Sequence, residues 1–564
     1  MKAAWRRLRE RLSADDAQAR SPAAAIGPKG FALLAGVFAV GCLVYGSMQF
    51  ARPGLVGADA YYHTRIARLM AERGLVFEGG FPWTQASSWR EHFADKEFAF
   101  HLLLIPFLGR DLTLGPKCLT ALLAALVMAL IAWMALRQRW PLPWLWPAVL
   151  LAAGVLLHLR LNLTRPHLLS ICLTVIAAHL MLRRSVWALL LVALAYPLCY
   201  TAAHMLPALA AVYALACLLA ARPFPWRTLG VVLSGTLLGL AFHPYRSEIL
   251  HLWYTQNFEV LSNAFDLAGA LAVEFQPPDG RLLVDDSGLL LFGTLGVCLG
   301  FLLLGRRASL RTIFLFAASG AYLILFLNVR RFVEYWAPFT VLFLASGSAD
   351  LLEGFDAAAW FRRHRIAASL CLAGGFALLV TQQLRGVTGA QEIIAQDARP
   401  RYEIESRWLG ALVPAGETVF SCWWVSFPFL FHRAPAQHYL VGLDPTFMTA
   451  DDPERFRLWV RISTGQEAEP ADRILERFGA RWVLAEKLEP HKPFLAQARR
   501  DRRFWLRFDG PEAAIFVIPP DVLPWAEVLA ARGLEGPAAA LGPLLSRALK
   551  AAWTGRPADT GGAK

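Results

Sequence analysis

The chain has 564 residues, of which 56% are apolar and 18% are charged, and its formal net charge at pH 7 is +13. This composition indicates a polytopic membrane protein and excludes a soluble enzyme with a single anchor. The positive charge does not indicate a nucleic-acid partner, because the basic residues fall in short clusters between apolar runs, where the positive-inside rule accounts for them.

The N-terminal segment 1–30 is basic and is not followed by a signal-peptide cleavage site, so we expect a cytoplasmic tail ahead of a retained first span. Basic clusters and apolar runs then alternate nearly throughout, which predicts about eleven transmembrane helices within residues 31–388 and external loops at 51–116 and 243–287. The predicted spans are residues 31–50, 117–136, 142–159, 168–182, 186–203, 205–220, 228–242, 288–304, 312–328, 332–346 and 366–381. The apolar run 98–108 is too short to cross alone; it lies at the interface, dips in, or forms a tilted span.

From residue 389 the pattern changes to short apolar runs and amphipathic helices, which predicts an external α/β domain over 389–520. The expected strands and helices in it are residues 419–424, 439–442, 471–486, 494–503, 504–508 and 513–518. Residues 521–564 are rich in Pro, Ala and Gly, so we expect a helical or disordered tail. The parity of the spans predicts an inner (plasma) membrane protein with a cytoplasmic N-terminus and a periplasmic C-terminal domain.

The loop after the first predicted span is crowded with charged, histidine and aromatic residues. Ionisable groups at membrane depth are costly, so they indicate a functional site. From Asp59 to Met70 the apolar side chains fall on one helical face. This predicts an amphipathic helix on the outer membrane surface, with Asp59 capping or preceding its N-terminus. The alternative is that Asp59 serves only as the cap.

Asp95 and Glu97 close the same loop. Two positions apart, both carboxylates face one site if the segment is extended and diverge if it is helical. They form either an acidic pair at the site or the solvated end of a loop. His63 and His101 are candidate metal ligands, and a hydrogen-bonding role is the alternative for each.

Four arginines lie in predicted external turns, where the positive-inside rule does not place cations: Arg160, Arg165, Arg330 and Arg331. A guanidinium stays charged and its planar fork bonds phosphate bidentately. We therefore predict that Arg331, Arg330 and Arg165 contact the phosphate of a lipid-linked donor. The alternative is that their side chains only snorkel to the interface.

The segment DAYYHTRIARLM, which begins at Asp59, resembles the first external loop of oligosaccharyltransferase catalytic subunits, which are glycosyltransferases of the GT-C fold. Three further segments match in the same order. Residues 272–277 (AVEFQP) keep the glutamate and the Gln-Pro pair of a family motif, and Arg331 opens a span as the family's phosphate-holding arginine does. Residues 421–427 (SCWWVSF) stand where the family has Trp-Trp-Asp-Tyr-Gly. The chain is similar to a divergent, bacterial-type member.

Two departures from the family pattern concern chemistry. The turn LTRPH at 163–167 has no carboxylate where the family carries Asp-x-Asp or Asp-x-Glu, and Val425 replaces the aspartate that reads the acceptor sequon. We therefore do not predict N-glycosylation of a sequon. The family implies a divalent cation, Mg²⁺ or Mn²⁺, which prefers several carboxylate oxygens. The residues available to hold it are Asp59, Glu274, His167, Asp95 and Glu97.

The resemblance implies transfer of a sugar or oligosaccharide, with inversion, from a polyprenyl-(pyro)phosphate donor to a protein or glycan acceptor on the outer face of the membrane. Asp59 is the candidate general base or acceptor-orienting carboxylate, with Glu274 as its partner. Trp423, Trp424 and Tyr62 are candidate acceptor contacts. The alternatives are a lipid-linked glycan transporter or flippase, and an inactive scaffold. A transporter would show paired half-helices or an inverted repeat, and the sequence shows neither.

Overall fold

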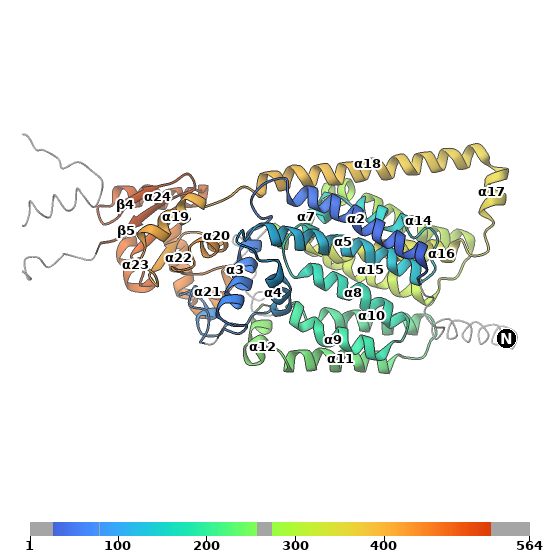
Figure 1. Ribbon diagram of the computed structural model, residues 1–564, viewed down its shortest axis with the longest axis horizontal. Coiled ribbons are helices and arrows are strands. Elements are labelled where there is room, and N and C mark those ends of the chain that lie inside the picture. The colour runs from blue at the N-terminus through green and yellow to red at the C-terminus, as the bar shows by residue number, and fades with distance from the viewer. Residues whose placement is uncertain (1–25, 78, 257–272, 520–564) are drawn as a thin grey trace, which may run out of the picture. The chain divides into compact units, whose positions relative to one another are not determined.

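The computed structural model describes residues 26–77, 79–256 and 273–519, and Figure 1 shows the helices and strands they form. The chain divides into two compact units. The first consists of Met1–Phe77 and Ala94–Pro400, and the second of Glu78–Phe93 and Arg401–Lys564. Most of the predicted N-terminal tail, the middle of the loop 243–287 and the tail 521–564 lie outside the described residues.

The helices of the first unit follow the apolar runs of the sequence. They are α2 (Pro28–Gln49), α3 (Ala58–Arg73), α4 (Phe98–Leu104), α5 (Leu114–Arg137), α6 (Leu145–Leu151), α7 (Val155–Leu161), α8 (His167–Leu182), α9 (Val186–Cys199), α10 (Met205–Leu219), α11 (Trp226–Ala241), α12 (Arg246–Tyr254), α14 (Gly288–Leu304), α15 (Leu310–Asn328), α16 (Val333–Leu351), α17 (Ala357–Arg363) and α18 (Arg365–Asp397). α18 lies along one side of the bundle, against α2, α6 and α7 (Figure 1).

Four of the described helices, α2, α5, α15 and α18, are long and apolar enough to cross a membrane. The pair α11 and α12, bent by 115°, adds a fifth if it forms one span, and five shorter apolar helical stretches accompany them. These features are those of a multi-pass membrane protein. The predicted number of about eleven spans stays a prediction.

Two predicted segments have a different form in the structure. The expected span 142–159 is broken into α6 and α7, because Gly154 between them has a φ of 104°, which a helix does not accommodate. Asp286 then accepts hydrogen bonds from the backbone N–H groups of Val155 (2.5 Å) and Leu156 (3.2 Å), at the N-terminus of α7. α18 continues past residue 389, where we expected the external domain to begin, as far as Asp397.

α3 differs from its predicted form in its cap and in its burial, and its place on the membrane surface stays a prediction. Its N-cap is Gly57, and Asp59 lies in the first turn without capping it. Most of the helix is buried on both faces, and it packs against α4 of the same loop. His63, on the side that was expected to face water, is therefore inside the protein, whereas the side chain of Arg68 is 40% exposed.

The second unit is an α/β domain, as predicted. Its strands β1 (Thr418–Ser421), β2 (His438–Tyr439), β3 (Trp482–Glu486), β4 (Trp505–Asp509) and β5 (Ala513–Val517) form one sheet in the order β2-β1-β3-β5-β4. β1 is parallel to β2 and β3, whereas β5 is antiparallel to β3 and β4. The helices of this unit are α19 (Glu403–Leu412), α20 (Phe427–Arg433), α21 (Thr446–Asp451), α22 (Pro453–Ser463), α23 (Pro470–Phe478) and α24 (Lys492–Arg500).

A piece of the predicted loop 51–116, residues Glu78–Phe93, also belongs to this second unit. The backbone N–H of Tyr439 donates to Trp83, and those of Gln85 and Ala86 donate to Tyr439 and Leu440, so the segment extends the β2 edge of the sheet. The ring of Phe81 contacts Phe427 and Phe431 of α20. The sequence did not predict that this loop segment packs in the second unit, because the only indication was a cluster of aromatic residues in a loop.

Candidate active site

Asp59 and Glu274, the two predicted catalytic carboxylates, are joined by one arginine. Arg165 places Nη2 2.9 Å from Asp59 Oδ2 and Nη1 2.9 Å from Glu274 Oε2. Nη1 also donates to Glu274 Oε1 at 3.1 Å. α3 supplies Asp59, the turn between α7 and α8 supplies Arg165, and a short 3₁₀ turn, Val273–Phe275, supplies Glu274. Three segments far apart in the sequence therefore meet at one guanidinium.

A second arginine extends the cluster into the buried interior. Arg160, near the end of α7, donates from Nη1 to Glu274 Oε2 at 2.5 Å and from Nε to Glu334 Oε2 at 2.7 Å. Arg160 is 4% exposed and Glu334, in the first turn of α16, is fully buried. Sequence reasoning missed Glu334. The available signal was a carboxylate inside an apolar run, where an ionisable residue needs a partner.

Glu274 and Asp59 differ in the number of positively charged groups around them. Burial by itself would raise the pKa of Glu274, but the guanidiniums of Arg165, Arg160 and Arg331 hold that pKa well below its usual range. A carboxylate held in the ionised form by several cations is a poor proton acceptor, but it holds those cations in place. Asp59 has Arg165 as its only ion-pair partner among the described residues, and its side chain is 31% exposed. Asp59 is therefore the carboxylate better suited to face a substrate.

The two neighbouring arginines before α16 hold the segment that carries Glu274. Arg330 donates to the carbonyl oxygens of Gln276 (3.3 Å) and Pro277 (3.0 Å). The guanidinium of Arg331 lies 5.3 Å from the centre of the Phe275 ring, which is a cation–π distance. Arg331 also donates to the hydroxyl of Tyr200 at 3.1 Å. Contact of either arginine with a lipid phosphate stays a prediction.

The residues do not fit a divalent cation between Asp59 and Glu274. A hard cation needs carboxylate oxygens that are free to bind it. Here Arg165 takes an oxygen of Asp59 and both oxygens of Glu274. The third expected ligand, His167, points Nε2 at the carbonyl oxygen of Arg160 (2.9 Å).

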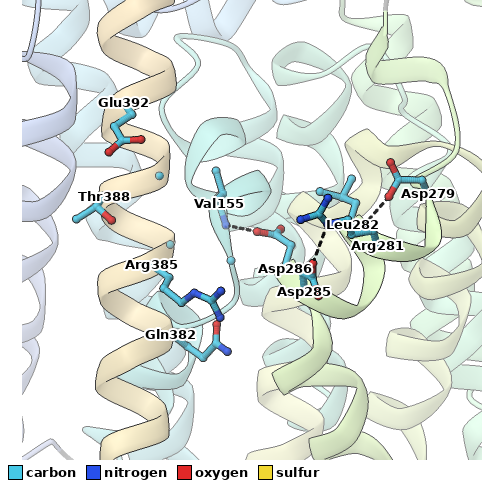
Figure 2. Close-up of a pocket in the computed structure, with 13 residues that line it drawn as sticks. Val155, Asp279, Arg281, Leu282, Asp285, Asp286, Gln382, Arg385, Thr388 and Glu392 are labelled. Atoms are coloured by element: carbon cyan, nitrogen blue, oxygen red, sulfur yellow. Dashed lines mark hydrogen bonds and ion pairs between the residues drawn. The ribbon is translucent and has the colours of Figure 1, made fainter.

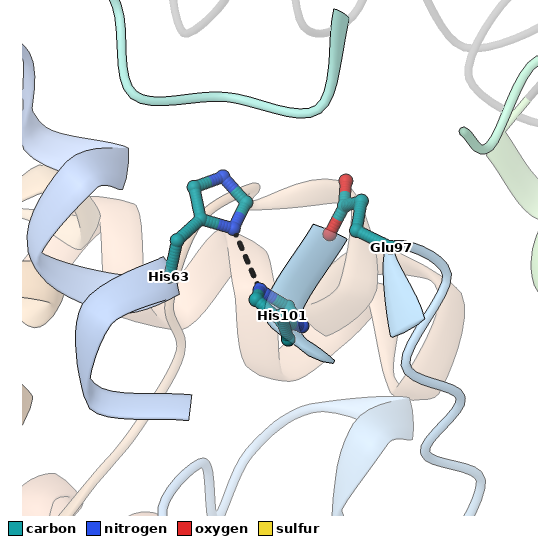
Figure 3. Close-up of side chains that lie close together, drawn as sticks. All are labelled: His63, Glu97 and His101. Atoms are coloured by element: carbon teal, nitrogen blue, oxygen red, sulfur yellow. Dashed lines mark hydrogen bonds between the residues drawn. The ribbon is translucent and has the colours of Figure 1, made fainter. Parts of the chain in front are cut away.

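Of the other expected metal ligands, Glu97 lies together with His63 and His101 (Figure 3), and Asp95 contacts His101. His101 Nδ1 is 2.8 Å from Asp95 Oδ2, and His101 Nε2 is 2.8 Å from His63 Nδ1. Burial, followed by the nearby charge of His101, lowers the pKa of His63 well below its usual value, so this ring is neutral. Burial raises the pKa of Glu97, an effect that the adjacent Lys96 opposes. Both carboxylates of the loop therefore face one buried cluster.

The predicted acceptor contacts are divided between the two units. Tyr62, in α3, is buried, and the centre of its ring lies 5.4 Å from the centre of the His63 ring. Trp423 and Trp424 belong to the second unit and are partly exposed. The buried carboxylate of Glu486 holds their turn, because it accepts hydrogen bonds from the backbone N–H of Trp423 and from the side chain of Ser426. Contact of these residues with an acceptor stays a prediction.

A separate cavity of about 510 Å³ lies between α7, α18 and the segment before α14 (Figure 2). Charged side chains line it from two sides, with Arg385 and Glu392 on α18 and Asp279, Arg281 and Asp285 across from them. None of the predicted site residues lines this cavity. It is therefore distinct from the Asp59–Arg165–Glu274 cluster.

No family model matches the chain, and no curated protein matches it by sequence. Solved structures match it by fold. The oligosaccharyltransferase of Archaeoglobus fulgidus, tethered with an acceptor peptide that contains the NVT sequon, is 12% identical with a TM-score of 0.58, over 86% of this chain and 74% of that one. AglB of the same organism, in complex with an inhibitory peptide and a dolichol-phosphate, is 13% identical with a TM-score of 0.56, over 87% and 74%.

A second kind of glycosyltransferase matches over nearly its whole length. ArnT from Cupriavidus metallidurans, bound to undecaprenyl phosphate, is 13% identical with a TM-score of 0.50, over 88% of this chain and 99% of that one. Its apo structure has a TM-score of 0.51. The chain therefore has the fold of the GT-C glycosyltransferases, and its structure resembles oligosaccharyltransferase AglB and ArnT.

Proposed function

We propose that this protein is a membrane glycosyltransferase that moves a sugar or oligosaccharide from a polyprenyl-(pyro)phosphate donor to an acceptor on the outer face of the membrane. The observation that carries the proposal is the meeting of Asp59, Arg165 and Glu274 at one site. The likeness to two GT-C proteins whose structures contain dolichol-phosphate and undecaprenyl phosphate supports a lipid-phosphate donor.

In the proposed reaction, a nucleophilic atom of the acceptor attacks the anomeric carbon of the sugar. The bond from that carbon to the phosphate oxygen breaks, its electron pair leaves with the phosphate, and the proton of the acceptor passes to the carboxylate of Asp59. A single displacement of this kind inverts the anomeric centre. Arg331 and Arg165 stabilise the negative charge that develops on the leaving phosphate, because their guanidiniums are already fixed by neighbouring groups.

Arg165 supplies at this site the positive charge that a divalent cation was expected to supply. It comes from the turn 163–167, where the resembling family carries its acidic pair, and it neutralises Asp59 and Glu274. Glu274, held ionised by three arginines, keeps those arginines in place. In this account Glu274 is a positioning residue and Asp59 is the base.

The experiment compares lipid-linked sugars in a strain that lacks the gene, after complementation with the wild type, Asp59→Asn or Glu274→Gln. We expect both variants to express normally and to accumulate unused donor. Asp285→Asn is the matched control, because this exposed carboxylate pairs only with the exposed Arg281 among the described residues. If both variants restore the wild-type profile, the proposed site is wrong and a scaffold role is the better account.

The direction of the chain in the membrane is part of the proposal. We infer a cytoplasmic N-terminus and a periplasmic second unit in the inner membrane, because the basic clusters then face the cytoplasm. Single cysteines introduced at exposed positions of the second unit, such as Glu489, test this with a membrane-impermeant thiol reagent. Labelling in intact cells supports the orientation, and labelling only after lysis contradicts it.

A further inference from the structure

His63, Glu97 and His101 form a compact group of metal-type ligands outside the Asp59–Arg165–Glu274 cluster. One ligand atom from each lies within 4.8 Å of the others, and all three residues are buried. Figure 3 shows the two imidazoles and the carboxylate turned toward one another. His63 comes from α3, His101 from α4, and Glu97 from the residue that precedes α4. Two helices of the loop thus supply the group together.

The neighbouring carboxylate of Asp95 determines which nitrogen of His101 faces the group. An ionised carboxylate only accepts, so His101 donates its Nδ1–H to Asp95 and keeps the lone pair on Nε2. That lone pair is directed at His63 Nδ1, 2.8 Å away. A carboxylate that holds the far nitrogen of an imidazole is the usual support of a metal-binding histidine. Asp95 itself also accepts from the backbone N–H of Glu97 at 3.1 Å, which fixes its position.

We propose that His63, His101 and Glu97 bind one transition-metal ion of the Zn²⁺ type, with Asp95 orienting His101. Two imidazole nitrogens and one carboxylate oxygen form a set that Zn²⁺ binds, with a fourth position left for water. Mg²⁺ and Ca²⁺ prefer oxygen ligands, so two nitrogens disfavour them. In a tetrahedral site the two nitrogens stand about 3.4 Å apart. Small rotations of the rings, together with transfer of the shared proton from His63 Nδ1 to the other nitrogen of that ring or to solvent, convert the hydrogen-bonded pair into a pair of ligands.

The bound ion would join α3 to α4. Asp59 lies one turn before His63 on α3, so an ion at this group would fix the helix that presents the proposed base. Of this group only Glu97 was among the residues expected to hold the catalytic cation, and the group includes neither Asp59 nor Glu274, which are engaged by Arg165. The proposal concerns a site that holds the loop together, and it does not depend on the reaction the protein performs.

The test is the metal content of the purified full-length chain. The protein is purified in detergent without chelator, incubated with Zn²⁺, passed over a gel-filtration column and assayed by elemental analysis. We expect one zinc ion per wild-type chain and none above background in His63→Ala or His101→Ala. Asp95→Asn should weaken affinity by roughly 10–100-fold, as loss of an outer carboxylate does. His364→Ala is the control, since His364 is an exposed histidine outside the group.

Competition by Mg²⁺, replacement of zinc by Co²⁺ and the Glu97→Gln variant test whether the bound zinc occupies this group. A 100-fold excess of Mg²⁺ should not displace the zinc, and Co²⁺ bound in its place should give the visible absorption of a tetrahedral site. Glu97→Gln retains the size of the side chain and should reduce the zinc content if the alanine variants fail to fold. A wild-type chain without zinc would show that Asp95, His101 and His63 form only a hydrogen-bonded chain. Equal zinc in wild type and Glu97→Gln would show that Glu97 does not bind the ion, which overturns the proposed three-ligand site.

Discussion

Arg165 Nη2 lies 2.9 Å from Asp59 Oδ2, and this ion pair joins the turn before α8 to the first turn of α3. Because Arg165 also reaches Glu274, the guanidinium stands between the two carboxylates of the site. We propose that this guanidinium orients Asp59 and stands in place of a metal ion shared by Asp59 and Glu274.

Arg165→Lys should lower donor turnover by roughly 100-fold, a loss typical of removing one preorganised donor from a charge-stabilising site. The substitution keeps the charge, but an ammonium cannot bridge two carboxylates as a planar fork does. Turnover of the lipid-linked donor by the purified chain measures the effect. Arg281→Lys, at an exposed arginine that pairs with Asp285, is the control and should leave turnover unchanged. Equal turnover in both variants contradicts the bridging role.

Arg160→Met should destabilise the first unit by about 3–5 kcal/mol, because it leaves the buried carboxylate of Glu334 without its cation. Adding Glu334→Gln should recover part of the loss, since the uncompensated charge is then removed. Denaturant titration of the purified variants in detergent measures both changes in the free energy of unfolding. If the double variant is less stable than Arg160→Met, the cost does not arise from the stranded carboxylate.

The stability of the second unit should depend on pH through Glu486. Burial, opposed by hydrogen bonds from Ser426 and backbone N–H groups, raises the pKa of this carboxyl from 4.5 to about 7. The folded state therefore binds the proton more tightly than the unfolded chain. Its contribution, about 3 kcal/mol, is complete below pH 4.5 and is lost as the pH rises to 7. The stability of the wild type relative to Glu486→Gln should fall between pH 5 and pH 8, and a constant difference would refute this.

Gly154→Ala should destabilise the chain by about 1–3 kcal/mol, because Gly154 has a φ of 104° and an added Cβ would collide with Asp286. Gly36→Ala is the matched control. A Cβ there meets nothing within 4 Å, and Gly36 lies inside α2, where alanine is the better helix former. Thermal unfolding compares the two. A similar melting temperature for both variants would mean that the break before α7 tolerates a side chain.

Apolar runs predicted most helices of the first unit because a membrane-length run of apolar residues has few other structures available. The sheet of the second unit was also predictable from short apolar runs between polar turns. The break at Gly154 was not predicted, because the run 142–159 stays apolar across it. The burial of α3 was missed because its periodicity shows which side chains are polar, whereas packing against α4 decides which are covered.

The sequence indicated the individual residues of the candidate site but not which of them form ion pairs with one another. Asp59, Glu274 and Arg165 were each singled out, but a one-dimensional pattern does not show that the arginine lies between the carboxylates. Glu334 was missed for the same reason, because its partner Arg160 is 174 residues away in the chain. Long-range ion pairs depend on how helices are arranged, and that arrangement is determined by packing.

The most direct test is release of polyprenyl (pyro)phosphate from a lipid-linked sugar donor by the purified chain in detergent, where no membrane remains to be crossed. We predict release by the wild type in the presence of an acceptor extract. We also predict loss of release in Asp59→Asn with donor binding retained. Release that is unchanged in Asp59→Asn would contradict the role of Asp59, and no release by a folded, donor-binding wild-type preparation would favour a transporter or a scaffold.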